Sequence, residues 1–426
     1  MKAFKKLIFV EGDLNRNKIY NMTDLGNGNW KAEWGRVGSS LQSTTFGMNV
    51  WDKKYNEKIK KGYKDVTENY VEEIVNEDTS NSNTKSNFVE FSKTRANSVV
   101  DFVKKLMGYA NKSIQENYTV SSKQVTQKQV DNAQAAFNKI AGLKADKDTY
   151  KEINNALLEL YSIIPRKMGH VKDYLLNIDD SDLEEKFNGI LKSEQDTLDV
   201  MAGQVLLNND IKEAQGEAEI ETDIPAEIDI LEAAGLELIE CTDDENKMLK
   251  NMMDYDKDKF HRAFKVINKS TQSRFENHIK SSKIDKKQLL WHGSRNENWW
   301  NIFQTGLLIR PSSAVYSGSM WADGIYFASS FDKSLGYTSI SGSRWAGGSN
   351  NTAILAVFEV HVGKQLVFDR HTSEAYKLSK QYLKDKGDYD STHARKGPSL
   401  YRDEFIVYDT AQCTIQYVVE VKGSQY

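Results

Sequence analysis

The sequence contains little proline and cysteine for its length, and it has no long hydrophobic run. Its four prolines, at positions 165, 225, 311 and 398, do not form a proline-rich linker. The two cysteines, Cys241 and Cys413, are too few for a disulfide framework and lack the spacing of zinc ligands. No segment has the roughly 20 consecutive apolar residues that cross a bilayer. The apolar residues 7–10 are too short for a signal-peptide core and run directly into acidic residues. We therefore expect an intracellular protein that is not secreted, has no membrane partner and binds no metal.

The length and charge of the chain suggest several soluble domains. A chain of 426 residues exceeds one ordinary core, which predicts about two to four domains. The net charge of −4 is unevenly distributed. Residues 1–70 contain 13 Lys and Arg against 8 Asp and Glu, whereas residues 210–232 contain 9 acidic residues and one lysine. The basic N-terminal part is thus a candidate for binding a polyanion, and the acidic stretch is a candidate linker.

The patterning predicts an α+β multidomain protein. In residues 1–76, short runs of β-branched and aromatic residues separated by glycines predict a small β-rich domain. A polar linker at 77–97 leads to residues 98–215, where apolar residues recur every three or four positions and predict an all-α helical bundle. An acidic linker at 216–235 precedes residues 236–426, which mix helices with alternating strands and predict a mixed β-sheet domain. Within this last domain we expect helices at 244–256 and 265–279, strands rich in Val, Ile and Tyr elsewhere, and no dinucleotide-binding GxGxxG turn.

Three short stretches of the last domain place polar groups against buried strands. "LLWHGSR" (289–295) puts His292 and Gly293 directly after an apolar run. "GIYFASSFDKSLGY" (324–337) combines a tyrosine-containing strand with a helical turn. "YRDEFIVYD" (401–409) puts Glu404 at the start of an apolar strand. Each stretch alone is a weak signal.

Together, in this order, the three stretches resemble the catalytic domain of poly(ADP-ribose) polymerases, which has the diphtheria-toxin-like ADP-ribosyltransferase fold. The resemblance covers residues from about 240 to the end. "NKIYNMTDLGNGNWKAEWGRVG" (17–38) is similar to a WGR domain, and the helical stretch with "LLELYSIIPRKMG" (157–169) is similar to the regulatory helical domain of DNA-dependent members. In that family the helical domain screens the NAD site until DNA binding loosens it.

The resemblance implies that NAD is the substrate and that Glu404, His292 and Tyr326 are the catalytic residues. Breaking the bond between nicotinamide and ribose builds positive charge on the ribose, as in glycoside hydrolysis. A carboxylate at Glu404 can hold the ribose 2′-hydroxyl, stabilise that charge and accept a proton from the incoming nucleophile.

The same resemblance implies how NAD is held. Gly293 has no Cβ, so its backbone can approach the carboxamide of nicotinamide, and the Ser334 hydroxyl can add a hydrogen bond. Tyr337 and Tyr326 can stack on the two sides of the ring, and we expect His292 to donate to a ribose hydroxyl. The full set of implied NAD-binding residues is His292, Gly293, Ser294, Tyr326, Lys333, Ser334 and Tyr337.

Three positions depart from the family pattern. Leu308 stands where the family usually has an arginine, and Arg310 lies nearby. Asn301 replaces a glycine on the intervening helix, and Trp321 replaces a smaller aromatic residue. The first two departures bear on affinity for the adenosine side of NAD more than on the chemistry.

We thus expect a DNA-break-activated poly(ADP-ribose) polymerase that modifies protein acceptors, including itself. Trp34 would stack on a terminal sugar or base of a DNA end, and Arg36 would meet phosphate. The alternatives are a mono-ADP-ribosyltransferase and a DNA-end-binding scaffold with weak transferase activity. Such an enzyme would work where DNA is, in the nucleoid of a bacterium or the nucleus of a eukaryote.

Overall fold

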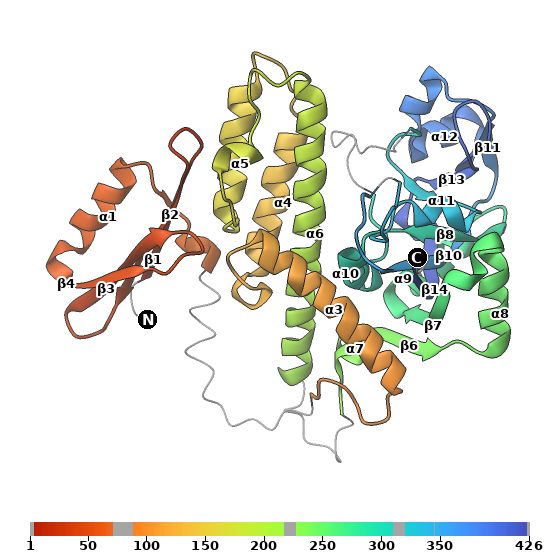
Figure 1. The fold of residues 1–426 in the computed structure, drawn as a ribbon, viewed down its shortest axis with the longest axis horizontal. Coiled ribbons are helices and arrows are strands. Elements are labelled where there is room, and N and C mark those ends of the chain that lie inside the picture. Colours follow the sequence, from red (N-terminus) through yellow and green to blue (C-terminus); the bar gives the residue numbers. More distant parts are fainter. Residues whose placement is uncertain (1–3, 71–87, 217–226, 310–319, 345, 424–426) are drawn as a thin grey trace. The chain divides into compact units, whose positions relative to one another are not determined.

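The computed structural model describes residues 4–70, 88–216, 227–309, 320–344 and 346–423 (Figure 1). These residues form two compact units. The N-terminal unit contains residues 4–70 and 111–208, and the C-terminal unit contains residues 88–110 and the described residues from 209 onward. The expected stretches 77–87, 217–226 and 310–319, including Arg310, lie outside the described residues.

The N-terminal unit begins with an antiparallel sheet covered by one helix, as the glycine-punctuated pattern predicts. Its strands are β1 (Phe4–Glu11), β2 (Arg16–Asp24), β3 (Asn29–Arg36), β4 (Gln42–Gly47) and β5 (Lys64–Asp65), in the order β4-β3-β2-β1-β5. Helix α1 (Trp51–Lys60) packs Trp51 edge-on against the fully buried Trp30 of β3, with ring centroids 5.2 Å apart. Gly62 follows α1 with a φ of 86°, a left-handed conformation that suits glycine at a helix end.

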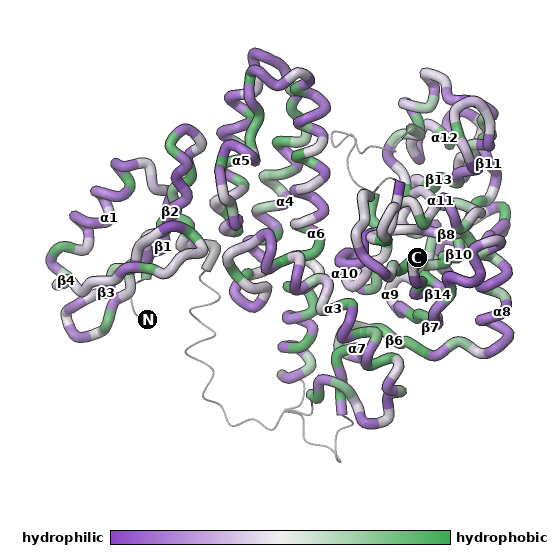
Figure 2. Tube along the Cα trace, in the orientation of Figure 1, coloured by the Kyte–Doolittle hydropathy of each residue, from purple (hydrophilic) through white to green (hydrophobic). Residues whose placement is uncertain are grey.

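The rest of the N-terminal unit is helical, which confirms the predicted period. The helices are α3 (Asn97–Asn117), α4 (Gln127–Ala141), α5 (Tyr150–Ile163) and α6 (Leu183–Gly216), of which α3 and α6 also extend into the C-terminal unit. Hydrophobic residues alternate with hydrophilic ones along each helix (Figure 2), because only one face of each helix is buried. The buried pair Arg166–Glu194, 3.0 Å apart, lies among these helices.

The C-terminal unit contains two sheets. One has the order β6-β7-β14-β10-β8, and the other has the order β11-β12-β13-β9. The strands of the first are β6 (Leu236–Glu240), β7 (Phe260–Asn268), β8 (Lys287–Gly293), β10 (Thr352–His361) and β14 (Cys413–Lys422). Those of the second are β9 (Ile325–Phe327), β11 (Gln365–Phe368), β12 (Ser391–Ala394) and β13 (Glu404–Val407).

Helices cover both faces of the first sheet. They are α7 (Ile230–Ala233), α8 (Asp243–Met252), α9 (Lys269–Ser281), α10 (Trp299–Thr305) and α11 (Phe331–Leu335). A further helix, α12 (Lys380–Gly387), packs against the second sheet. On one face, residues of α8 and α11 pack with Trp291. On the other face, the indole of Trp299 in α10 donates to the carbonyl of Ile354 at 3.0 Å. The central strand β10 is therefore hydrophobic almost throughout.

The predicted helix at 265–279 is wrong in its first four residues. Residues 265–268 complete β7, and α9 begins only at Lys269. Val266 and Ile267 are β-branched and fit a strand. Asn268 then caps the helix, because its side chain accepts the backbone N–H of Thr271 at 2.9 Å.

The described parts of the two expected linkers pair with each other. The backbone N–H of Val89 donates to the carbonyl of Ile228 at 2.9 Å. Asp229 is fully buried and forms an ion pair with Arg95. This part of the acidic stretch is therefore packed structure, since a buried carboxylate needs a cationic partner.

The first half of α3 packs on the C-terminal unit. Phe102 stacks on Phe264 of β7 with centroids 4.8 Å apart. Glu420 of β14, only 1% exposed, lies between Lys105 of α3 and Arg262 of β7. Two limits of the compact units fall inside α3 and α6, between residues 110 and 111 and between residues 208 and 209.

We predict that Lys105→Met destabilises the C-terminal unit by about 1–3 kcal/mol, because it leaves the buried Glu420 carboxylate with one cation instead of two. Hydrogen exchange of the β14 amides measures this loss. Lys112→Met is the matched control on the same helix. Its partner Glu116 is 3.8 Å away and both side chains are exposed, so the change should stay within about 0.5 kcal/mol. Equal exchange in both variants would contradict the prediction.

Candidate active site

The site forms where the two sheets of the C-terminal unit join. The backbone N–H of Trp291 in β8 donates to the carbonyl of Ala328 at 2.8 Å, and the N–H of Ala328 donates back at 3.0 Å. This pair of hydrogen bonds brings "WHGSR" next to "GIYFA". β9 in turn pairs with β13, where Tyr326 lies opposite Ile406. Because side chains alternate along a strand, Glu404 lies on the same face as Ile406 and therefore near Tyr326.

His292 is held as a neutral acceptor. Its Nδ1 lies 2.9 Å from the carbonyl oxygen of Tyr326, which can only accept, so Nδ1 carries the proton. Burial lowers the pKa of His292 despite that hydrogen bond. The remaining nitrogen, Nε2, is thus an unprotonated acceptor. We expected His292 to donate to a ribose hydroxyl, and this geometry gives the opposite polarity: the hydroxyl would donate to His292.

Gly293 and Ser334 are in direct contact. A Cβ on Gly293 would lie 1.9 Å from the carbonyl oxygen of Ser334, so only glycine allows α11 to approach β8 this closely. Ser334 is 4% exposed and its backbone carbonyl also accepts the N–H of Tyr337 at 3.1 Å. The structure therefore brings together Gly293, Ser334 and Tyr337, three of the four residues expected to hold nicotinamide.

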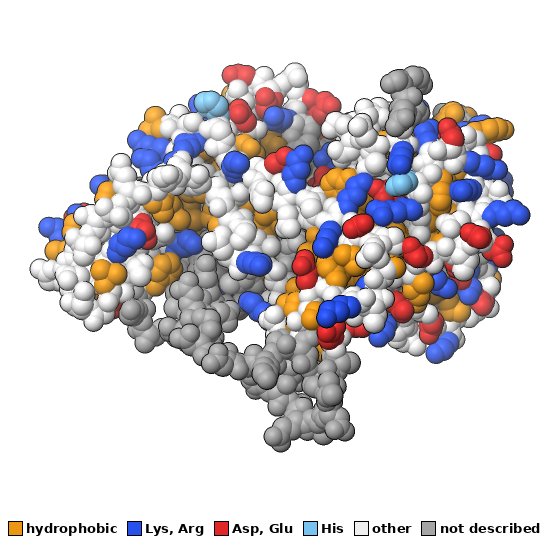
Figure 3. Space-filling view, turned by 60° about the horizontal axis from the view of Figure 1, so that its bottom comes forward, with side chains coloured by type: hydrophobic (Ala, Val, Ile, Leu, Met, Phe, Trp, Pro, Cys, Tyr) orange, Lys and Arg blue, Asp and Glu red, His pale blue; other side chains and the backbone are white. Residues whose placement is uncertain are grey.

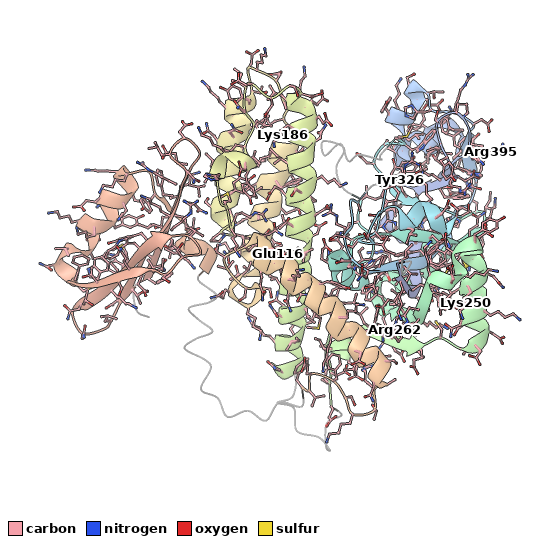
Figure 4. The ribbon with its side chains drawn as sticks, in the orientation of Figure 1. Glu116, Lys186, Lys250, Arg262, Tyr326 and Arg395 are labelled. Atoms are coloured by element: carbon pink, nitrogen blue, oxygen red, sulfur yellow. The ribbon has the colours of Figure 1, made fainter. Side chains whose placement is uncertain are left out.

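The hydroxyl of Tyr326 is occupied by the backbone that precedes its strand. It donates to the carbonyl of Ala322 at 2.7 Å and accepts the N–H of Trp321 at 2.9 Å. Burial, followed by the nearby Tyr408, raises the pKa of Tyr326, so the hydroxyl stays protonated. Figure 4 labels Tyr326 beside the strands of the second sheet.

Glu404 is a buried carboxylate with one oxygen paired and one not. It is 5% exposed, and its Oε1 lies 2.5 Å from Nζ of Lys333 on α11. Its Oε2 is also buried and has no hydrogen-bond partner among the described residues. Burial, followed by the charge of Glu404, raises the pKa of Tyr337 to about 12. Lys333, which we expected to bind NAD, is the counter-charge of the Glu404 carboxylate.

The remaining residues singled out in the sequence lie in the segments that follow β8, from Ser294 to Trp321. The Ser294 hydroxyl accepts from the Asn298 side chain at 3.1 Å. Asn301 is buried in α10, and Leu308 is 41% exposed. Trp321 is buried against Phe368, with ring centroids 5.1 Å apart. The larger indole therefore fills the core of the second sheet.

Trp34 and Arg36 belong to the N-terminal unit. Trp34 is partly buried, with its ring 6.3 Å from that of Tyr20. Arg36 donates to the carbonyls of Asn15 at 2.9 Å, Met168 at 3.1 Å and Gly169 at 2.9 Å. Arg36 thus ties the N-terminal sheet to the segment after α5. Its expected contact with phosphate stays a prediction.

One ion pair and one hydrogen bond beside Glu404 were missed by sequence reasoning. Arg402 pairs with Asp332 of α11, and His393 of β12 pairs with Asp403. Three of these four residues, Asp332, Arg402 and Asp403, were visible as charges inside the stretches 324–337 and 401–409. The partners are 70 residues apart in the first pair, so no local pattern links them.

Comparisons with known proteins agree with this geometry. A family model for the poly(ADP-ribose) polymerase catalytic domain matches residues 243–423. The putative poly [ADP-ribose] polymerase-like protein 100L of invertebrate iridescent virus 6 is 33% identical over 169 residues, which cover 38% of this chain and 88% of that protein. The chain belongs to the poly(ADP-ribose) polymerase family. It is therefore an ADP-ribosyltransferase that uses NAD as its substrate.

Two further proteins are also similar to this chain. Protein 101L of the same virus is 34% identical over 208 residues, covering 49% of this chain and 80% of its own length. Poly [ADP-ribose] polymerase 2 of Zea mays is 28% identical over 214 residues, covering 43% of this chain but 31% of its own length. In the part of the chain that the structure describes, no three His, Cys, Asp or Glu side chains gather as metal ligands, and no helix is long and apolar enough to span a membrane.

We predict that this enzyme loses activity in acid only below the pH range in which histidine side chains usually titrate, because the site needs a neutral His292 and burial lowers its pKa. The kcat/KM for nicotinamide release should stay level from about pH 8 to about pH 6.5 and fall only below that. A pH profile checks this, with His292→Gln as the comparison that assigns the acidic limb. A limb above about pH 6.5 that disappears in His292→Gln would contradict the neutral acceptor role.

Proposed function

We propose that this chain is a DNA-break-activated poly(ADP-ribose) polymerase that modifies protein acceptors, including itself, and elongates the chain. The observation that carries the polymerase part is the buried carboxylate of Glu404, whose Oε2 has no hydrogen-bond partner in the described parts of the chain while Lys333 holds Oε1. A carboxylate fixed in this way is preorganised to bind a ribose hydroxyl and to stabilise positive charge.

The groups around Glu404 suit cleavage of the nicotinamide–ribose bond. That bond breaks with its electron pair going to nicotinamide, which leaves as a neutral amide. Gly293 and Ser334 orient the carboxamide, and Nε2 of His292 accepts a hydrogen bond from a ribose hydroxyl. The oxygen of the incoming nucleophile, on the molecule that receives ADP-ribose, then bonds to C1′ of the ribose, and its proton passes to the Glu404 carboxylate. The sum of the steps releases nicotinamide and one proton.

Lys333 contributes to the same step through charge. Its ammonium, 11% exposed, is the counter-charge that a carboxylate buried to this extent needs. The Glu404 carboxylate can accept the proton of a ribose hydroxyl on a chain end, and this is what elongation requires beyond a single transfer. Loss of elongation with retained single transfer would favour the mono-ADP-ribosyltransferase alternative.

We predict that Glu404→Gln abolishes elongation while leaving NAD binding nearly intact, because the amide keeps the shape and loses the proton acceptor. Elongation should fall by more than about 100-fold, and binding of a benzamide should change by less than about threefold. Gel analysis of labelled product and calorimetry measure the two effects. Full-length polymer from Glu404→Gln would overturn the role of this residue.

The surface of the N-terminal unit supports binding of a polyanion. Lys58 lies over the ring of Tyr20, with Nζ 4.0 Å from its centroid. Burial, followed by the nearby Lys61, Lys54 and Lys18, lowers the pKa of Lys58. Lysines crowded in this way repel one another, and a nucleic-acid backbone would relieve the repulsion. The C-terminal unit differs, because basic and acidic side chains are interspersed on the face shown in Figure 3.

Coupling between DNA and the transferase site is part of the proposal. Helices α3 and α6 each contain residues of both units, and they are therefore the candidate connection between DNA binding and the transferase site. Arg36 is placed to transmit such a change, because it holds the carbonyls of residues 168 and 169. DNA would have to bind the active state better than the inactive one.

We predict that Lys58→Met and Arg36→Ala fail differently. Lys58→Met should weaken DNA binding at every sequence and lower the salt slope of binding by about 1. Arg36→Ala should keep more of the binding but lose the DNA stimulation of NAD cleavage, and both variants should keep the basal rate. Trp34→Ala should lose stimulation as well.

Fluorescence anisotropy with nicked DNA and nicotinamide release measure the two properties. Lys147→Met, which removes an exposed lysine elsewhere in the N-terminal unit, is the matched control for net charge. Basal activity without any response to DNA in the wild-type chain would reject break activation. DNA binding without nicotinamide release would favour the scaffold alternative.

A further inference from the structure

Glu404, the first residue of β13, and the two residues before it each contact a polar side chain, and two of these three contacts are ion pairs. Arg402 pairs with Asp332, Asp403 pairs with His393, and Glu404 pairs with Lys333. Arg402 and Glu404 therefore bind two successive residues of α11. Alternation along the chain directs Asp403 to the opposite side, toward β12.

The pair of Arg402 and Asp332 has the geometry of a fork. Nε of Arg402 lies 3.2 and 3.1 Å from the two carboxylate oxygens of Asp332, and Nη2 lies 2.9 Å from Oδ2. Such a contact fixes direction as well as distance. The guanidinium also lies over the ring of Tyr401, 4.4 Å from its centroid. Burial works against ionisation, but hydrogen bonds from Arg402 and Ser330 hold the pKa of Asp332 below its usual range.

Asp403 secures the other side of the same segment. Its Oδ2 lies 2.8 Å from Nε2 of His393, and its Oδ1 accepts the backbone N–H of Lys396 at 2.8 Å. The residue before the catalytic carboxylate is thus attached to β12 while the residues on either side of it are attached to α11. Rotation of this segment about its own axis would break all of these contacts.

The lysine of the third pair cannot provide such control alone. Lys333 is a point charge on a flexible stem of four carbons, whereas the arginine fork is rigid and planar. α11 itself is fixed, because Ser334 packs against Gly293 with no room for a Cβ. Whatever fixes the start of β13 against α11 therefore also fixes Glu404 against the groups that hold nicotinamide.

We propose that Arg402 is a positioning residue for the transferase reaction, which aligns Glu404 through its fork contact with Asp332. The pair does not contact the nicotinamide-binding groups Gly293 and Ser334. Removing it should thus lower the rate of bond cleavage and leave ligand binding almost unchanged. A small displacement of a reacting carboxylate is enough to lower the rate of reaction by about 10- to 100-fold.

A double-mutant cycle in the full-length chain tests this inference. The variants are Arg402→Gln, Asp332→Asn and the combination of both. Nicotinamide release gives kcat and KM for NAD, and calorimetry gives the affinity for a benzamide. We expect each single variant to lose about tenfold in kcat, with KM and benzamide affinity within about twofold. The double variant should lose about as much kcat as the less active of the two single variants, because both substitutions remove the same contact.

Arg395→Gln is the matched control. Arg395 forms a 3.4 Å pair with Asp369 in the same unit, both side chains are exposed, and Figure 4 labels it at the outer edge. Its removal should leave kcat and KM unchanged. Asp332→Asn keeps the size of its side chain, so it provides the measurement if Arg402→Gln does not fold.

Three outcomes would overturn the inference. Unchanged kcat in both single variants would show that Lys333 alone aligns Glu404. Multiplied losses in the double variant would show that the two residues act separately. A parallel loss of benzamide affinity would show that α11 has moved and that the pair is merely structural. A wild-type chain that releases no nicotinamide would instead count against the enzyme assignment itself.

Discussion

The two hydrogen bonds between Trp291 and Ala328 are the contact on which the catalytic arrangement depends. They join the two sheets of the C-terminal unit through their strands β8 and β9. Without that junction, His292 and Gly293 would end one sheet while Tyr326 and Glu404 belonged to another. The indole of Trp291 strengthens the junction, since it is fully buried and donates to the carbonyl of Met252 at 3.2 Å.

Buried carboxylates organise the chain, and each of those discussed above has a cation. Glu194 has Arg166, Asp229 has Arg95, Glu420 has two cations, and Glu404 has Lys333. The first three are satisfied by partners on other segments and hold those segments together. Glu404 differs because one of its oxygens remains buried without a hydrogen bond. That difference separates a carboxylate that is ready for a ligand from carboxylates that are structural.

Much of the fold was predictable from local sequence, because the signals were local. The hairpins of the first sheet follow from short β-branched runs between glycines, and α4 and α5 follow from their apolar period. The motifs named the candidate nicotinamide-binding residues, whose role stays a prediction, and the structure brings two of them, Gly293 and Ser334, into contact. The start of α9 was not, because residues 265–268 fit both a helical and a strand pattern.

The unpredicted parts depend on contacts between distant residues. The neutral tautomer of His292 depends on a carbonyl in another strand, so no pattern around "WHGSR" reveals it. Arg402 and Asp332 carry ordinary surface charges in the sequence, and only the fold pairs them. The packed part of the acidic linker has the same origin, since Asp229 needs Arg95 from the other linker.

The placement of α3 has a consequence for biosynthesis. Lys105 and Glu420 are 315 residues apart in the chain, and β14 is synthesised after every other described strand and helix. At ribosomal speeds of roughly 5–20 residues per second, the apolar side of α3 around Phe102 waits about 8–32 s for Phe264 of β7, and Lys105 waits on the order of 15–60 s for Glu420 of β14. During that interval its apolar side is exposed, and a chaperone or the rest of the helical segment has to cover it. The N-terminal sheet has no such delay, because all of its strands lie within residues 4–65.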